Sequence, residues 1–99
     1  MAQLDQIIHQ TVRLQIMSSL VSLEQRERVN FTTLRKLLKL TDGNLGAHLN
    51  KLEQTGYIKI EKTFVARKPQ TFIFVTGKGR DAFAEHIAAL QQIIQGTEK

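Results

Sequence analysis

The sequence predicts a mostly helical α+β fold in a single domain over residues 1–99. Ninety-nine residues with 41% hydrophobic content are enough for one core. Apolar residues recur at helical spacing in four stretches, residues 4–23, 32–40, 41–55 and 77–95. Two further stretches, residues 57–64 and 70–75, are rich in β-branched and aromatic side chains, which favour strands. The expected order is helix, short strand, helix, helix, β-hairpin and a long last helix.

Positive charge is concentrated in the middle of the chain. The net charge is +5 and the pI is about 9.9, but residues 29–80 hold ten lysines and arginines against three acids, a balance of +7 that leaves −2 for the two ends. This pattern predicts a polyanionic partner for the middle segment. The alternative is a basic surface that only meets water.

The absence of cysteine excludes disulfides and thiolate metal sites, and it fits a reducing cytoplasm. No apolar run approaches the ~18 residues of a membrane span, and the N-terminus has no targeting pattern. We therefore expect a cytoplasmic protein without a membrane partner.

The first two helices differ in how much of their surface is apolar. Apolar side chains wrap most of the circumference of residues 4–23, so this helix must be covered on more than one side. Residues 29–31 then predict a short strand, and Thr32 is the expected N-cap of a short second helix. Its predicted buried face consists of Leu34, Leu37 and Leu38.

The third helix, residues 41–55, has one thin apolar stripe of Leu45, Leu49 and Leu52. Thr41 is its expected N-cap and Gly56 its expected left-handed end. The opposite face is small and polar, and interior glycine costs roughly 1 kcal/mol against alanine, so Gly43 and Gly46 suggest close approach by a partner. The DNA major groove admits such a helix, and Asn and Lys read base edges there. The alternative is that glycine only opens the helix and the polar face is solvated.

The two predicted strands flank the turn VARKP and form a β-hairpin with a cationic tip of Arg67 and Lys68. Charged tips are common simply because they stay solvated and discourage edge pairing. Beside a candidate recognition helix, however, two adjacent cations also suit contacts to a phosphate backbone.

The element order, together with "RLQIMSSL", "LTDGNLGAHLNKLEQTGYI" and "VTGKGR", resembles the winged helix-turn-helix regulators of the MarR and ArsR groups, in particular compact ones without a separate effector domain. The resemblance covers roughly residues 6–90. It implies sequence-specific binding to double-stranded DNA and regulation of transcription. Winged helices also serve as protein-interaction adaptors in larger assemblies, which is the alternative.

The resemblance also assigns roles to residues. Residues 41–55 would be the recognition helix in the major groove, and Arg67 and Lys68 would be the wing beside or inside the minor groove. Separately, we expect phosphate contacts from Lys36, Lys51, Arg67 and Lys68. The recognition-helix residues nearest DNA would be Thr41, Asp42, Gly43, Asn44, Ala47, His48 and Lys51. Gly46 stands where such proteins often have serine, and Gly77 and Lys78 stand where they often have proline and an acid. These departures affect the expected target sequence more than the expected fold.

The last helix predicts self-association. Thr76 is its expected cap, and Phe83, Ile87, Leu90 and Ile94 repeat at coiled-coil-like spacing. With the apolar coat of residues 4–23, this predicts a homodimer whose interface is formed by Ile7, Ile8, Phe83, Ile87, Leu90 and Ile94. The alternative is that both helices only close the core. A dimer would set two recognition helices roughly 34 Å apart, one turn of DNA, on a pseudo-palindromic site.

The sequence gives little support for catalysis or a cofactor. His9, His48 and His86 form no metal-binding pair. Asp81, Glu85 and His86 do not match the ArsR ligand spacing, so these three side chains of the last helix are expected on a solvated face. The glycines at the start of the last helix lack the phosphate-loop pattern. We expect a protein that is not an enzyme and has no metal or cofactor; whether a small-molecule effector exists stays open.

Overall fold

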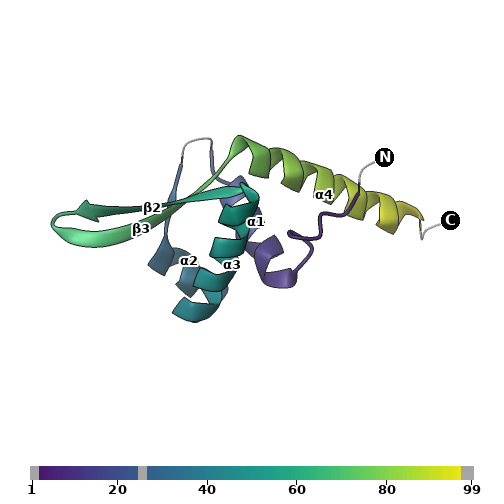
Figure 1. Ribbon diagram of the computed structural model, residues 1–99. Coiled ribbons are helices and arrows are strands. Elements are labelled where there is room, and N and C mark those ends of the chain that lie inside the picture. The colour runs from purple at the N-terminus through teal and green to yellow at the C-terminus, as the bar shows by residue number, and fades with distance from the viewer. Residues whose placement is uncertain (1–2, 25–26, 97–99) are drawn as a thin grey trace.

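The computed structural model describes residues 3–24 and 27–96 and confirms the predicted winged helix-turn-helix order (Figure 1). Within these ranges, no helix is long and apolar enough to cross a membrane. The elements are α1 (Thr11–Val21), β1 (Val29–Asn30), α2 (Phe31–Leu38), α3 (Asp42–Thr55), β2 (Ile58–Val65), β3 (Lys68–Val75) and α4 (Gly77–Gly96).

The three strands form an antiparallel sheet in the order β1-β3-β2. The hairpin ladder is continuous, from Ile58 opposite Val75 to Val65 opposite Lys68. The short β1 pairs only with Phe72 and Ile73, so nothing in the sheet flanks the outer half of β3 on that side. The hairpin therefore projects from the helices as a free arm (Figure 1).

The core lies where α1, α2 and α3 meet the inner half of the sheet. Because α1 sits between the other elements, it buries Ile16, Met17 and Leu20, which agrees with the expectation that helix one is covered on several sides. The other fully buried apolar side chains from helices and strands are Leu34, Leu45, Leu49, Leu52, Ile58 and Ile73.

The N-terminal segment is shorter as a helix than the periodicity predicts. α1 begins at Thr11, where the Gln10 side chain accepts a hydrogen bond from the Arg13 backbone N–H at 2.9 Å. Before it, the Asp5 carboxylate accepts from the backbone N–H groups of Ile7 and Ile8 at 2.8 and 3.0 Å and holds a separate turn. This turn buries Ile8 completely in the core, so the prediction that Ile8 lines a dimer interface is wrong.

The second helix departs from the prediction in two details. It begins at Phe31, because Asn30 and not Thr32 is the cap; the Asn30 side chain accepts from the Thr32 N–H at 2.8 Å. Leu34 is fully buried as expected, but Leu37 is 63% exposed. Placing Leu37 on the buried face was therefore wrong, since this two-turn helix packs through a narrower stripe than its leucines suggest.

α4 is fixed at its start and extends away from the hairpin (Figure 1). Thr76 caps it as predicted: its hydroxyl accepts from the Gly79 N–H at 3.0 Å and donates to the Gly56 carbonyl at 2.7 Å. The Arg80 guanidinium donates to the carbonyls of Val21 and Leu23 at 3.1 and 2.9 Å, at the end of α1. Arg80 is thus one of the basic residues of the middle segment whose charge serves the fold.

Candidate nucleic-acid interface

Local capping and a tight turn position α3. The left-handed Lys39 (φ 57°) ends α2 and turns the chain back within three residues. The Thr41 hydroxyl accepts from the Asn44 N–H at 3.1 Å, as predicted, and left-handed Gly56 (φ 89°) ends the helix. The Asp42 carboxylate lies 2.9 Å from Arg35 Nε, so an ion pair joins α2 to the start of α3.

The outer face of α3 is open to solvent. Leu45, Leu49 and Leu52 turn inward and are buried. A methyl group built on Gly43 would meet nothing within 4 Å, so nothing in the part of the chain that the structure describes covers that point of the helix. Most of the predicted recognition residues are exposed: Thr41, Asp42, Gly43, Asn44, Ala47 and Lys51. The structure therefore brings these side chains together on one free surface.

His48 has a different environment from the other predicted recognition residues. It is half-buried, and its Nδ1 lies 3.2 Å from Arg13 Nη1 on α1. Because a guanidinium has no acceptor, Nδ1 accepts this hydrogen bond. Burial lowers the pKa of His48, and the positive charge of Arg13 lowers it further. The ring therefore helps to join α3 to α1, and its predicted role in DNA binding stays a prediction.

The tip of the hairpin presents Arg67 and Lys68 to solvent. The two turn residues, Ala66 and Arg67, both have positive φ (51° and 67°), as a two-residue type I′ turn requires. This tight turn places the two cations at the far end of the arm, both exposed. Lys36, the predicted phosphate contact on α2, is also exposed.

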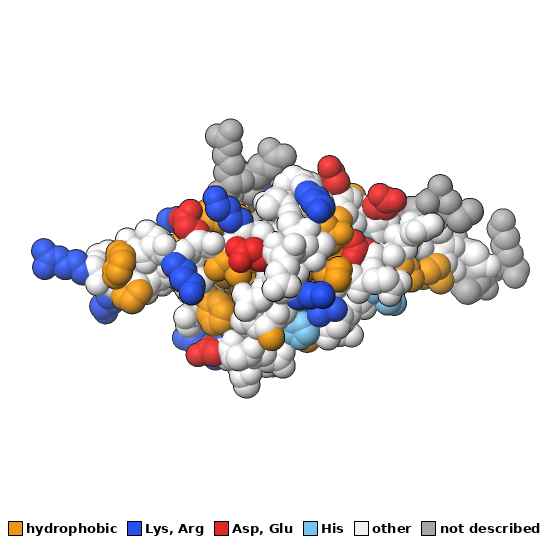
Figure 2. Space-filling view, in the orientation of Figure 1, with side chains coloured by type: hydrophobic (Ala, Val, Ile, Leu, Met, Phe, Trp, Pro, Cys, Tyr) orange, Lys and Arg blue, Asp and Glu red, His pale blue; other side chains and the backbone are white. Residues whose placement is uncertain are grey.

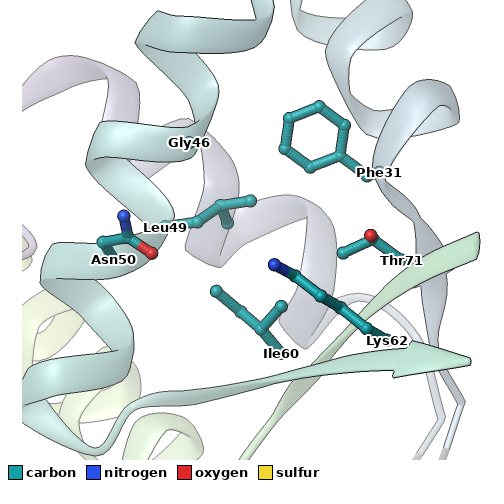
Figure 3. Close-up of a pocket in the computed structure, with 7 residues that line it drawn as sticks. All are labelled: Phe31, Gly46, Leu49, Asn50, Ile60, Lys62 and Thr71. Atoms are coloured by element: carbon teal, nitrogen blue, oxygen red, sulfur yellow. The ribbon is translucent and has the colours of Figure 1, made fainter.

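A pocket of about 310 Å³ lies between α3, the start of α2 and the hairpin (Figure 3). Figure 3 shows the long side chain of Lys62 pointing from β2 toward the middle of the pocket-lining residues. Gly46 forms part of the wall without a side chain, and a methyl group there would meet nothing within 4 Å. The lining residues are Phe31, Gly46, Leu49, Asn50, Ile60, Lys62 and Thr71.

Basic side chains gather over the hairpin and the neighbouring helices on the face shown in Figure 2. Lys62 is a further exposed cation on β2 that the sequence analysis did not assign to the interface. A signal for it existed: strand residues alternate between faces, so Lys62 follows Ile58 and Ile60 toward α3, whereas Lys59 points the other way. Lys62 therefore joins Lys51, Arg67 and Lys68 as a candidate DNA contact.

The comparison with known families agrees with this geometry. The family model described as "Winged helix DNA-binding domain" matches residues 12–94. The chain belongs to this family. An uncharacterised protein of Methanocaldococcus jannaschii is 38% identical over 92 residues, which are 93% of this chain and 97% of that protein.

Solved structures resemble this winged helix over nearly its full length. A transcriptional regulator homologue from Pyrococcus horikoshii is 32% identical, with a TM-score of 0.84 over 94% of this chain and 89% of that one. A PadR family transcriptional regulator from Eggerthella lenta, 22% identical, shares the fold with a TM-score of 0.67 over 92% and 89% of the two chains. The family match and the Pyrococcus horikoshii homologue point to a DNA-binding regulator. Membership of the MarR or ArsR group stays a prediction.

One expectation about α4 is corrected. His86 was expected on a solvated face with Asp81 and Glu85, but its side chain is fully buried. His86 Nδ1 accepts from the Asp5 backbone N–H at 2.9 Å, and Nε2 has no hydrogen-bond partner within residues 3–24 and 27–96. Among these same residues, no three His, Asp or Glu side chains are grouped so that they could hold a metal ion.

Proposed function

We propose that this winged helix binds double-stranded DNA sequence-specifically as a homodimer in the cytoplasm and regulates transcription. The observation that carries the proposal is the free outer face of α3 beside a cationic arm. Asn44 and Lys51 are exposed on α3, and Arg67 is exposed at the end of the arm. In this arrangement α3 enters the major groove and the hairpin follows the backbone to the neighbouring groove.

The proposed contacts divide into two kinds. Lys36, Lys51, Arg67 and Lys68 neutralise phosphates and position the protein, which gives affinity for any sequence. Asn44 and Lys51 present donors and acceptors to base edges, Asn being suited to adenine and Lys to guanine. Gly43 and Ala47 have small or no side chains, so the backbone of α3 can approach the bases closely beside Asn44 and Lys51.

The proposed dimer interface consists of the exposed flank of α4 and the turn before α1. α4 buries its small residues Gly79 and Ala89 against the body, which leaves the larger residues of the predicted seam partly exposed. Phe83, Ile87 and Leu90 are half-buried, and Ile94 is 58% exposed. Pairing these flanks across a twofold axis would cover them and present two α3 helices to one side of DNA.

Salt dependence of DNA binding tests the proposal. A fluorescently labelled mixed-sequence duplex is titrated with wild type, R67A/K68A and K59A at several salt concentrations. The double variant removes two proposed phosphate contacts from each chain of the homodimer, four in all, so its slope of log K against log salt should be smaller by about 3.6. K59A is the control, because Lys59 is exposed on the face of β2 away from α3. An unchanged slope in R67A/K68A would remove the arm from the mechanism, and no salt-sensitive binding by the wild type would favour the adaptor alternative.

A further inference from the structure

Phe64 is the most exposed large hydrophobic side chain in the described part of the chain. It lies on β2 one residue before the end of the strand, and 73% of its surface is open to solvent. An aromatic side chain contributes most to binding or stability when it is buried, and no described residue of this protein covers the Phe64 ring. Figure 2 shows hydrophobic side chains beside the Lys and Arg side chains at the end of the hairpin.

Strand geometry gives the direction of the Phe64 ring. Side chains two residues apart share a face of a strand, so Phe64 lies on the same face as Ile60 and Lys62, which line the pocket against α3. Its cross-strand neighbour is Pro69, on the same face, and the two form an apolar edge. Phe64 is about 13 Å farther along the strand than Ile60, beyond the reach of α3.

The charges near the apolar edge of Phe64 and Pro69 indicate which kind of molecule binds there. Lys62 shares the face of Phe64, Arg67 lies in the adjoining turn, and Lys68, which pairs across the strands with Val65, lies on the opposite face. Within residues 3–24 and 27–96 the ion pairs join only Arg28 to Glu61 and Arg35 to Asp42. The three cations therefore keep their full charge at the end of the hairpin, with Lys62 on the side of the ring. A second copy of this basic chain would bring the same cations to the contact, whereas DNA brings phosphates.

We propose that the apolar edge of Phe64 and Pro69 enters the DNA minor groove next to the major groove that holds α3. The inference rests on the proposed DNA binding and deepens it. The Phe64 ring packs on deoxyribose and base edges while the flanking cations hold the two phosphate backbones. Apolar wedges in the minor groove partly unstack a base step and bend the duplex, so base steps that unstack easily are preferred there.

A single introduced tryptophan tests the contact directly. The chain has no tryptophan, so F64W and V65W each carry one fluorescent reporter. Val65 is the matched control, because it is the next residue on β2 and faces the opposite side. On addition of a mixed-sequence duplex of about 30 base pairs, roughly three helical turns, F64W should be quenched and protected from acrylamide, and V65W should stay accessible. A bound F64W that acrylamide still reaches overturns the inference, as does protection of F64W at high protein concentration without DNA.

Affinity provides the second measurement. F64A should weaken binding to the same duplex by about fivefold to 150-fold for each chain of the homodimer that contacts DNA, the range expected when one aromatic contact to a base is lost. The salt slope should not change, because no phosphate contact is removed. V65A should bind within about twofold of the wild type. If the wild type binds DNA with the expected salt dependence and F64A binds equally well, this inference fails and the proposed function stands; if the wild type does not bind DNA, both fail.

Discussion

At the scale of single residues, His86 shows how a buried polar group joins distant parts of the chain. Its Nδ1 accepts from the backbone of Asp5, 81 positions earlier, and its ring contacts that of His9 with centroids 5.4 Å apart.

Asp5, which lies beside His86, and Tyr57 shift each other's pKa. Burial raises the pKa of Asp5, but the Tyr57 hydroxyl and the backbone N–H groups of Ile8 and Ile7 together lower it more, so the charged carboxylate is stabilised. Burial, and then Asp5, raise the pKa of Tyr57 to about 12.

His86 predicts a loss of stability in mild acid. Burial lowers its pKa most, the charge of His9 adds to this, and Asp5 opposes it. A proton on Nδ1 would also remove the acceptor for the Asp5 N–H. Because the unfolded chain binds the proton more tightly, this stability is complete above about pH 6.5 and is lost as pH falls through the lowered pKa, by up to about 1.4 kcal/mol per pH unit.

Urea unfolding at pH 7 and pH 5 measures this effect in the wild type, H86Q and H48Q. H86Q should show the smaller loss between the two pH values, because glutamine keeps an acceptor and does not titrate. H48Q is the control for the other histidine with a lowered pKa. An equal loss in the wild type and H86Q would assign the pH dependence to other groups.

At the scale of elements, α4 is docked through a glycine. A methyl group built on Gly79 would lie 2.1 Å from the Tyr57 carbonyl oxygen, so the helix contacts the backbone of the α3–β2 connection directly. The same carbonyl accepts from the Thr76 N–H at 3.0 Å. Only glycine allows this approach, which fixes the angle at which α4 leaves the body.

This close approach predicts unequal effects of two alanine substitutions in α4. G79A must push the helix off a backbone atom that cannot move alone, so it should lower the free energy of unfolding by about 1–3 kcal/mol. G77A adds a methyl group where nothing lies within 4 Å, and it should be neutral or slightly stabilising. Denaturant titration of both variants measures the difference. Similar stabilities for G79A and G77A would contradict the docking role of Gly79.

The elements that the sequence predicts well are those defined by local interactions. The cap at Thr41, the leucine stripe of α3, left-handed Gly56 and the hairpin all follow from neighbouring residues. The start of α1 does not, because the turn before it depends on Asp5, whose partners Tyr57 and His86 are distant in sequence.

α4 shows a second limit of sequence prediction. The large residues of its 4-3-4 repeat mark an apolar seam, but the helix packs on the small residues beside that seam and on His86. Gly79, His86 and Ala89 lie at helical spacing, so a search that scored small residues as packing positions would have found this face. The sequence likewise does not reveal that Phe64 is exposed, because the alternation of residues along a strand does not tell how far α3 extends along the hairpin.

At the scale of the whole molecule, the proposed DNA-contacting arm and the proposed dimer interface lie at opposite ends. The molecule measures 58 × 25 × 21 Å, with the tip of the hairpin at one end and the last turns of α4 at the other (Figure 1). Arg67 and Lys68 lie at the first end, whereas residues 90–96 of α4 carry no charge. An uncharged helix end with exposed Ile93 and Ile94 suits a contact between two copies of a basic protein, because it brings no repelling charges together.

A charge introduced at this end should therefore separate association from folding. I94E places a carboxylate on the proposed seam at a position that is 58% exposed, so it should cost the single chain little stability. It should halve the mass measured by sedimentation at micromolar concentration. DNA affinity should fall by about 10²-fold or more, because each α3 then binds without the avidity of a linked partner. Q95E adds the same charge at the next, exposed position and should leave both values unchanged. A wild-type chain that sediments as a monomer while binding DNA with full affinity would contradict the dimer and place all of the affinity in one α3 and one arm.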